Sequence, residues 1–213
     1  FEDLNLVCFY SNSCMDIILK DLIKLWGKPV NQKKIDLDTP IGLISTDTRT
    51  IEKGNFFIPL VGNKFDGHNF LDMAFDCGIQ AAIVSEKFNG SVPTGLTYWI
   101  VSDTLYAYQQ IALLHRRNLN LPVIAITGSV GKTTTRELIK VLMSSLGEIV
   151  SSNENENNDV GVPKTLLRGT VKDAAYVLEM GMRGLGQIER LSRCSEPDIA
   201  IITNVGQAHI GIL

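Results

Sequence analysis

A lysine and neighbouring hydroxyl groups end a glycine-containing loop in the second half of the chain. The stretch 123–135 reads V-I-A-I-T-G-S-V-G-K-T-T-T, an apolar β-branched run followed by the loop and the first residues of a helical pattern. Small residues let backbone N–H groups point at a phosphate, the lysine adds a cation, and a hydroxyl can reach Mg²⁺. The positive end of the following helix favours the same anion. We therefore predict a nucleotide-phosphate site, with a plain strand–turn–helix connection as the alternative.

This loop differs at one position from the common phosphate-loop spacing. Ile126 stands five residues before Gly131, where that spacing has glycine, so the pattern is T-G-x-x-G-K-T-T. The residues that we assign to the phosphates are Gly128, Ser129, Val130, Gly131, Lys132, Thr133 and Thr134.

A carboxylate and an imidazole follow two other apolar runs. Glu179 ends the run 176–179, and His209 follows the run 201–204. If these runs are parallel strands, both side chains open on the same edge of the sheet as Lys132. There they can bind Mg²⁺ or position a water molecule. The alternatives are a solvated strand end for Glu179 and a surface histidine for His209.

An asparagine-rich segment, 153–159, lies between these groups. Its composition fits a disordered polar stretch. However, Pro163 just after it suits the first turn of a helix. Amide side chains such as Asn157 and Asn158 would then lie at a helix start, where they can hydrogen-bond a polar substrate. Composition alone leaves both readings open.

Strands and helices alternate along the second half and must position these groups. We expect strands at 123–127, 148–151, 174–180 and 198–205, and helices at 133–146, from 163 and at 186–194. Along the helix 133–146, the residues expected to face inward are Leu138, Ile139, Leu142 and Leu146. Such alternation predicts a parallel sheet covered by helices on both faces.

The first half shows shorter elements of the same kinds. We expect helices at 15–26, 71–77 and 104–118, and strands at 42–46, 55–60, 81–85 and 98–101. The fold class is therefore α/β, with a small α/β domain at 1–118 and a mostly parallel-sheet domain at 119–213, whose first residues, 119–122, form a linker.

Composition excludes several functional classes. The chain has 213 residues, 45% of them apolar, and a net charge of −3, which argues against a general nucleic-acid binder. No apolar run approaches the ~18–20 residues that span a bilayer. The four cysteines are scattered without a C-x-x-C pair, which indicates reduced thiols and a cytoplasmic protein.

Because the chain begins at Phe1 and ends at Leu213 just after a strand-like run, we expect a fragment.

Ordered motifs over residues 40–213 resemble the ATP-dependent Mur ligases of peptidoglycan synthesis. In the second half these are T-G-S-V-G-K-T-T, N-E-N-N-D-V-G-V-P-K-T-L-L, L-E-M-G-M and N-V-G-Q-A-H-I-G. In the first half, S-T-D-T-R, G-N-F-F and G-N-K-F-D-G-H-N-F are similar to the UDP-sugar-binding domain of that family. The asparagine pair before G-V-P resembles the member that adds D-alanyl-D-alanine, rather than those that add one amino acid.

This resemblance implies a reaction and its cofactors, ATP and Mg²⁺. ATP would phosphorylate the terminal carboxylate of a UDP-N-acetylmuramoyl tripeptide. The amine of D-alanyl-D-alanine would then attack the acyl phosphate, in cell-wall synthesis for growth and division. Lys132 would contact the β/γ end of ATP, and Thr133 would bind a first Mg²⁺. Glu179 and His209 would help to hold a second Mg²⁺.

The resemblance also implies substrate contacts. Asn157 and Asn158 would line the junction between nucleotide and substrate, whereas Thr48 and Arg49 would contact the uridine diphosphate. Asp66, Gly67 and His68 match a family motif in the first domain, and a structural turn is their alternative reading.

The sequence differs from the family pattern at one point, and three alternative interpretations stay open. The family has a further metal-binding lysine downstream of the histidine, but the sequence ends four residues after His209, so we expect these residues alone to be inactive. A different Mur ligase or a folylpolyglutamate synthetase shares the loop, although the other motifs disfavour the folate enzyme. A nucleotide-dependent switch is a second alternative, but no N-K-x-D guanine-reading motif is present. A partly folded fragment is the third. We expect a monomer that binds neither nucleic acid nor membrane.

Overall fold

The computed structural model describes residues 14–31, 38–182 and 184–206. The chain divides into two compact units, Phe1–Thr104 and Leu105–Leu213. Among the helices described, none is long and apolar enough to cross a bilayer.

The first unit is built on a four-stranded parallel sheet with the order β3-β4-β7-β8. These strands are β3 (Ile44–Ser45), β4 (Phe56–Phe57), β7 (Ala81–Ser85) and β8 (Tyr98–Val101). Two antiparallel pairs accompany them, formed by β1 (Cys14–Ile18) with β2 (Pro40–Gly42) and by β5 (Val61–Gly62) with β6 (Phe65–Asp66). The helices are α1 (Leu19–Trp26), a 3₁₀ turn (Gly67–Phe70) and α2 (Leu71–Asp76).

The helix predicted at 15–26 is only partly correct. Its first residues form strand β1, and the helix begins at Leu19. Met15 and Ile17, two residues apart, are both buried, so this stretch has the period of a strand rather than that of a helix. The strand predicted at 42–46 is divided between the end of β2 and β3, and that at 55–60 is reduced to Phe56–Phe57.

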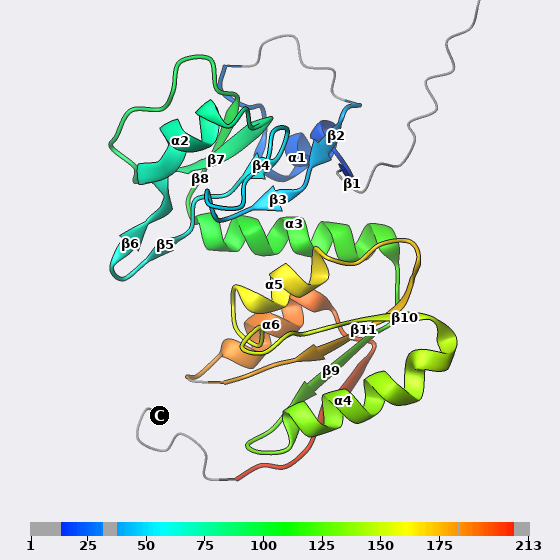
Figure 1. The fold of residues 1–213 in the computed structure, drawn as a ribbon. Helices are drawn as coiled ribbons and strands as arrows, with labels where there is room; N and C mark the ends of the chain where they lie inside the picture. Colours follow the sequence, from blue (N-terminus) through cyan, green and yellow to red (C-terminus); the bar gives the residue numbers. More distant parts are fainter. Residues whose placement is uncertain (1–13, 32–37, 183, 207–213) are drawn as a thin grey trace, which may run out of the picture. The chain divides into compact units, whose positions relative to one another are not determined.

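The second unit carries a second parallel sheet, with the order β10-β11-β9-β12. Its strands are β9 (Val123–Thr127), β10 (Glu148–Ser151), β11 (Asp173–Glu179) and β12 (Ile199–Ile202). The helices are α3 (Thr104–Leu119), α4 (Lys132–Met143), a 3₁₀ turn (Ser144–Leu146), α5 (Gly161–Leu166) and α6 (Gln187–Ser195). Helix α4 lies on one face of the sheet, and α5 and α6 lie on the other (Figure 1). The predicted parallel sheet with two covered faces is confirmed.

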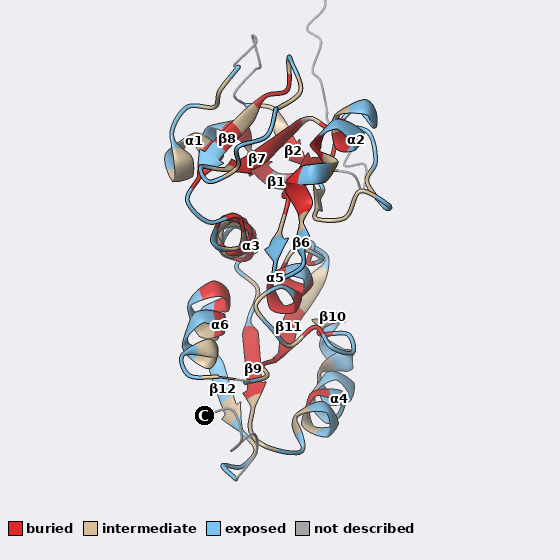
Figure 2. Ribbon diagram, turned by 90° about the vertical axis from the view of Figure 1, so that its left-hand side faces the viewer, coloured by how far each residue is buried: buried red, intermediate tan, exposed pale blue. Residues whose placement is uncertain are grey.

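Burial on both faces explains why the central strands are continuously apolar. Because side chains alternate along a strand, Val123 and Ala125 pack with the helices α5 and α6, whereas Ile124 and Ile126 lie on the opposite face. Figure 2 shows β9 and β11 as mostly buried and α4 as mostly exposed. This two-sided core fixes the strand ends at which the loops begin.

The prediction for the inward face of α4 is wrong in large part. Leu138, Leu142 and Leu146 are 61%, 76% and 69% exposed. Ile139 packs against the sheet as predicted, together with Met143, which was not in the predicted set. One residue along a helix corresponds to a rotation of about 100°, so Leu138 and Leu142, each one position before a packed residue, point away from the sheet.

Helix α3 packs within the second unit. Ala112 belongs to its core, and the Arg116 guanidinium donates to the carbonyl oxygens of Ser195 and Glu196. The division between the compact units therefore falls at the start of α3, whereas the sequence placed the boundary after residue 118. The functions assigned to the two parts stay predictions.

Candidate functional site

The carboxyl ends of three strands meet at one edge of the second sheet. Strand β9 pairs with β11 and β12 on either side, with Ile126 opposite Glu179 and Thr127 opposite Ile202. The loops that leave these ends therefore begin side by side. Ligands of open parallel sheets collect at this edge.

The loop after β9 uses two glycines with left-handed backbone. Gly128 has φ 138° and Gly131 has φ 83°, conformations that L side chains rarely adopt. Gly131 is the N-cap of α4, and Lys132 is its first residue. The first N–H groups of a helix have no acceptor within it, so the start of α4 offers donors to an anion. The Lys132 ammonium lies on the same loop and donates to the Gly128 carbonyl at 2.6 Å.

Glu179 lies at the centre of the polar contacts beside this loop. One carboxylate oxygen accepts from the Thr133 hydroxyl at 2.9 Å and from the Arg136 guanidinium at 3.3 Å. The other accepts from the Asn157 amide at 3.0 Å. Glu179 is 5% exposed, and a buried carboxylate is stable only when such donors surround it. The structure thus brings Thr133, Asn157 and Glu179 together, rather than leaving Glu179 as a solvated strand end.

Two residues of this cluster were missed by sequence reasoning. Arg136 is buried on α4, where it contacts both Glu179 and Glu137. The Ser152 hydroxyl accepts from the Glu179 N–H at 3.0 Å. A signal for Arg136 was available, because it stands three residues after Thr133 and four after Lys132, on the same side of a helix. Nothing in the sequence distinguishes Ser152 from other serines.

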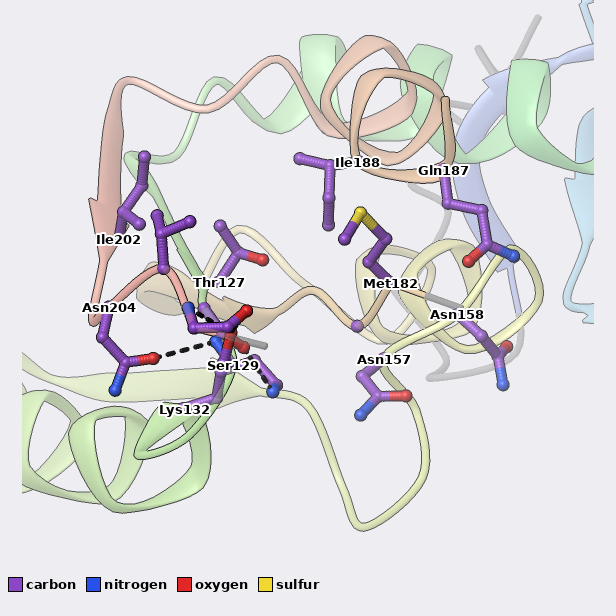
Figure 3. Close-up of a pocket in the computed structure, with 14 residues that line it drawn as sticks. Thr127, Ser129, Lys132, Asn157, Asn158, Met182, Gln187, Ile188, Ile202 and Asn204 are labelled. Carbon is purple, nitrogen blue, oxygen red and sulfur yellow. Dashed lines mark hydrogen bonds between the residues drawn. The ribbon is translucent and has the colours of Figure 1, made fainter. Parts of the chain in front are cut away.

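A cavity of about 540 Å³ opens beside the loop. Figure 3 shows Lys132, Ser129 and Asn204 on one side of it, and Asn157 and Asn158 on another. Met182, Ile188 and Ile202 add apolar lining. A cavity with a cationic, donor-rich end and an apolar wall suits a ligand that combines a phosphate with a less polar group.

The two asparagines have different contacts. Asn157 reaches Glu179, whereas the Asn158 side-chain oxygen accepts from the N–H groups of Val160 and Gly161 at 3.1 and 2.9 Å. Asn158 therefore stabilises the start of α5. Both line the cavity, and the segment around them is ordered by internal hydrogen bonds rather than being a free polar stretch.

The side-chain oxygen atoms of Thr133 and Glu179 beside the loop are suitable ligands for Mg²⁺. Mg²⁺ is usually bound by one or two protein oxygens, together with phosphates and water, and the adjacent Thr133 hydroxyl and Glu179 carboxylate are of that kind. Within the described ranges, no group of three or more His, Cys, Asp and Glu side chains could hold a metal by itself. His209 lies outside the described residues, so its meeting with Glu179 stays a prediction.

Thr48 and Arg49 lie in the loop after β3 of the first unit. The Arg49 side chain is 86% exposed and pairs with Asp47 through its Nε at 2.9 Å. Hydrogen bonds from Arg49 lower the pKa of Asp47 to about 2. Thr48 is half-buried. Both Nε and Nη2 of this exposed guanidinium pair with the Asp47 carboxylate, so its Nη1 end remains accessible to an anionic ligand.

Asp66, Gly67 and His68 have contacts that support the structural-turn reading. His68 is 2% exposed and stacks on Phe88. Its Nε2 accepts from the Ser85 N–H at 2.9 Å, so Nδ1 carries the proton and donates to Asp66. A Cβ at Gly67 would lie 2.8 Å from the Pro59 Cα, so this backbone approach requires glycine.

Comparison with known proteins agrees with this arrangement. Residues 126–213 match the model of the Mur ligase middle domain. The chain is 44% identical over 176 residues to a UDP-N-acetylmuramoyl-tripeptide–D-alanyl-D-alanine ligase of Synechocystis sp., covering 83% of this chain and 38% of the relative. This chain thus spans well under half the length of that relative.

Solved structures give the same result. MurF from Acinetobacter baumannii superposes with a TM-score of 0.81 at 35% identity, over 92% of this chain and 42% of that one. MurF ligase from Thermotoga maritima in complex with ADP has a TM-score of 0.70 at 29% identity, over 78% of this chain and 38% of that one. Since the family model matches the sheet edge described above, and the similarity extends through both units, the chain belongs to the Mur ligase family.

Proposed function

We propose that this chain is part of an ATP-dependent ligase that joins D-alanyl-D-alanine to UDP-N-acetylmuramoyl-tripeptide in peptidoglycan synthesis. The names of its relatives support this reaction. The observation that carries it is the Thr133–Glu179 contact at 2.9 Å beside the phosphate loop, which joins a nucleotide site to a buried carboxylate. We further propose that the enzyme acts in the cytoplasm as a monomer.

The chemistry requires charge neutralisation and alignment rather than a covalent nucleophile. ATP transfers its γ-phosphoryl group to the terminal carboxylate of the tripeptide, and the amine then displaces phosphate from the acyl phosphate. In this scheme, Lys132 and the N–H groups at the start of α4 offset the charge of the transferring oxygens. Asn157 orients Glu179 at the junction with the second substrate.

Thr133 would hold a first Mg²⁺, and Glu179 would help to hold a second, with His209 as a further ligand from the segment after β12. When bound, the metal neutralises phosphate charge. Arg136 would help to keep the Glu179 carboxylate oriented, because its guanidinium contacts the same oxygen as Thr133. Thr133 and Glu179 thus form part of an oxygen-rich site that the phosphates complete.

The first unit would bind the uridine diphosphate end of the substrate. Arg49 is the candidate cation for the diphosphate, with Thr48 beside it, because its guanidinium is exposed and can form paired hydrogen bonds to phosphate. Asp66, Gly67 and His68 would support that domain mainly by shaping the turn, since the His68 ring is buried.

The test is phosphate release by the full-length protein with D-alanyl-D-alanine or with single amino acids as the acceptor. Turnover with the dipeptide is expected, and turnover with only a single amino acid would refute the assignment. Lys132→Ala should reduce turnover by about a hundredfold or more, while binding of the UDP-linked substrate changes little. Equal loss of turnover and substrate binding would contradict the two-site arrangement.

A further inference from the structure

A second segment, Thr203–Gly206, holds the outer part of the phosphate loop. This segment follows β12, and it contacts the loop residues Gly128–Val130, which we call the loop arm. The Asn204 side-chain oxygen accepts from the N–H groups of Ser129 and Val130, each at 3.1 Å. Figure 3 shows the Asn204 side chain directed at this arm. Two consecutive backbone donors are therefore fixed by one amide oxygen.

The Thr203 hydroxyl binds a backbone carbonyl of the loop arm. This hydroxyl lies 2.6 Å from the Val130 carbonyl and 3.2 Å from the Thr127 carbonyl. A hydroxyl has one hydrogen, so Val130, the nearer acceptor, receives the stronger bond. Since Asn204 binds the N–H of Val130 and Thr203 binds its carbonyl, both polar backbone groups of that residue are held by the same short segment.

The remaining contacts show a close fit between the two segments. Gly206 donates its N–H to the Ser129 hydroxyl at 2.9 Å, and this hydroxyl lies 3.1 Å from the Gly206 carbonyl. A Cβ at Gly128 would lie 2.1 Å from the Thr203 hydroxyl and 3.0 Å from the Asn204 N. The arm therefore rests directly on this segment, and glycine at position 128 permits the approach.

These contacts separate the loop into two functional parts. The arm is held by the segment after β12, whereas the first N–H groups of α4 have no acceptor within the helix. A phosphate-binding loop binds its anion more tightly when its donors already point inward, because ordering them on binding costs free energy. The arm leads directly into Gly131 and Lys132, the N-cap and first residue of α4.

We propose that Thr203 and Asn204 are positioning residues that hold the phosphate loop in its nucleotide-binding shape. The inference rests on the proposed nucleotide binding and assigns residues to the shape of that site. Neither side chain is required to touch a phosphate. Their effect passes through the backbone of Ser129 and Val130.

The test compares variants of the full-length protein by calorimetric titration with ADP in the presence of Mg²⁺. Thr203→Val keeps the side-chain shape and removes the hydroxyl, and Asn204→Ala removes the acceptor. Each should raise the Kd for ADP about tenfold, the effect of losing one or two ordering hydrogen bonds. Thr203→Ser should restore affinity to within about threefold of the original protein, because it retains the donor.

A matched control is Thr170→Val, which removes an exposed hydroxyl that contacts Asp173. It should leave the Kd unchanged. Hydrogen exchange of a peptide that covers the loop arm gives a readout independent of nucleotide: Asn204→Ala should speed exchange at Val130, whereas the Ser129 N–H keeps its second acceptor, the Asn204 main-chain carbonyl. The KM for ATP should rise in both test variants, while that for D-alanyl-D-alanine stays unchanged.

The outcomes separate the two proposals. If the unaltered protein does not bind ADP, nucleotide binding itself is refuted, and the positioning role fails with it. If it binds ADP but Thr203→Val binds equally well, the positioning role alone is refuted. Tighter binding by Asn204→Ala would also refute it, since Asn204 would then compete with phosphate for the two N–H groups.

Discussion

Glu179 receives its donors from segments far apart in the chain. Thr133 and Arg136 come from α4, and Asn157 precedes α5. Ser152, which follows β10, instead accepts from the Glu179 N–H. Since the carboxylate is buried and accepts several hydrogen bonds, its position is fixed before any ligand binds. Fixed charge of this kind is what phosphoryl transfer requires of a protein.

Replacing Glu179 by Gln tests this role. The amide keeps the shape but removes the negative charge that would hold Mg²⁺. We expect turnover of the full-length protein to fall by about two to three orders of magnitude, with a higher Mg²⁺ concentration needed for half-maximal rate. Steady-state phosphate release at varied Mg²⁺ measures both. Glu189→Gln, at an exposed residue of α6, is the control, and equal loss in both variants would exclude a specific role.

At the scale of elements, a buried carboxylate organises the asparagine-rich segment. Glu156 pairs with Arg168 at 2.7 Å and with Lys164 at 3.0 Å, and it also accepts from the Asn153 N–H. Burial acts to raise the pKa of Glu156. The hydrogen bonds from Lys164 and the Asn153 N–H, and the charges of Arg168 and Lys164, outweigh this effect, so the pKa lies below its ordinary value. The charged form therefore holds the loop that carries Asn157.

This contact predicts a pH-dependent stability. Because the pKa of Glu156 is lower in the folded protein, its contribution is complete above the ordinary pKa of 4.5 and is lost as the pH falls through the folded value. Glu156→Gln should lower the free energy of unfolding by about 2 kcal/mol at pH 7. The difference from the original protein should shrink below about pH 4.5.

Urea unfolding at several pH values measures that difference. The exposed Glu154, in the same segment, provides the control Glu154→Gln, for which we expect little change. A difference between Glu156→Gln and the original protein that stays constant down to pH 3 would contradict an ionised Glu156 as the stabilising group.

Helices and strands were predicted correctly where a contiguous run of residues shows a clear apolar period. The alternation of strands and helices after residue 120 agrees with the structure, because each apolar run is long enough to show its period. The packed face of α4 could not be predicted in the same way. Its leucines and its Ile139–Met143 stripe are both apolar, and only contact with the sheet decides between them.

At the scale of the whole molecule, α3 follows the first unit in the chain and packs in the second unit. Arg116 is buried and bonds to Ser195, Glu196 and Asp198, whereas its neighbour Arg117 is exposed and pairs with Glu196. Gln109 also donates to the Asp159 carbonyl. The stability of the second unit should therefore depend on α3.

Arg116→Met should destabilise the second unit by about 2–3 kcal/mol, since it leaves the buried Ser195 carbonyl oxygen without its charged donor. Arg117→Met should change stability by less than about 1 kcal/mol, because exposed ion pairs contribute little. Urea unfolding followed by hydrogen exchange of β9 and β11 measures this effect. Equal effects of the two substitutions would mean that α3 is not part of the second unit's cooperative core.

The sequence by itself determined the glycine-containing loop between β9 and α4, the parallel α/β class and the order of the family motifs. These features are written in contiguous residues, whose spacing and backbone preferences act locally. It also identified Glu179 at a strand end, because the carboxyl ends of parallel strands share one edge.

Only the tertiary structure decided which side chains meet there. Arg136, Ser152 and the Thr203–Asn204 pair contact Glu179 or the loop arm across 27 to 75 positions of sequence. No local pattern encodes such contacts. They arise because packing on both faces of the sheet sets the register of its strands, and the register sets the neighbours of each strand end.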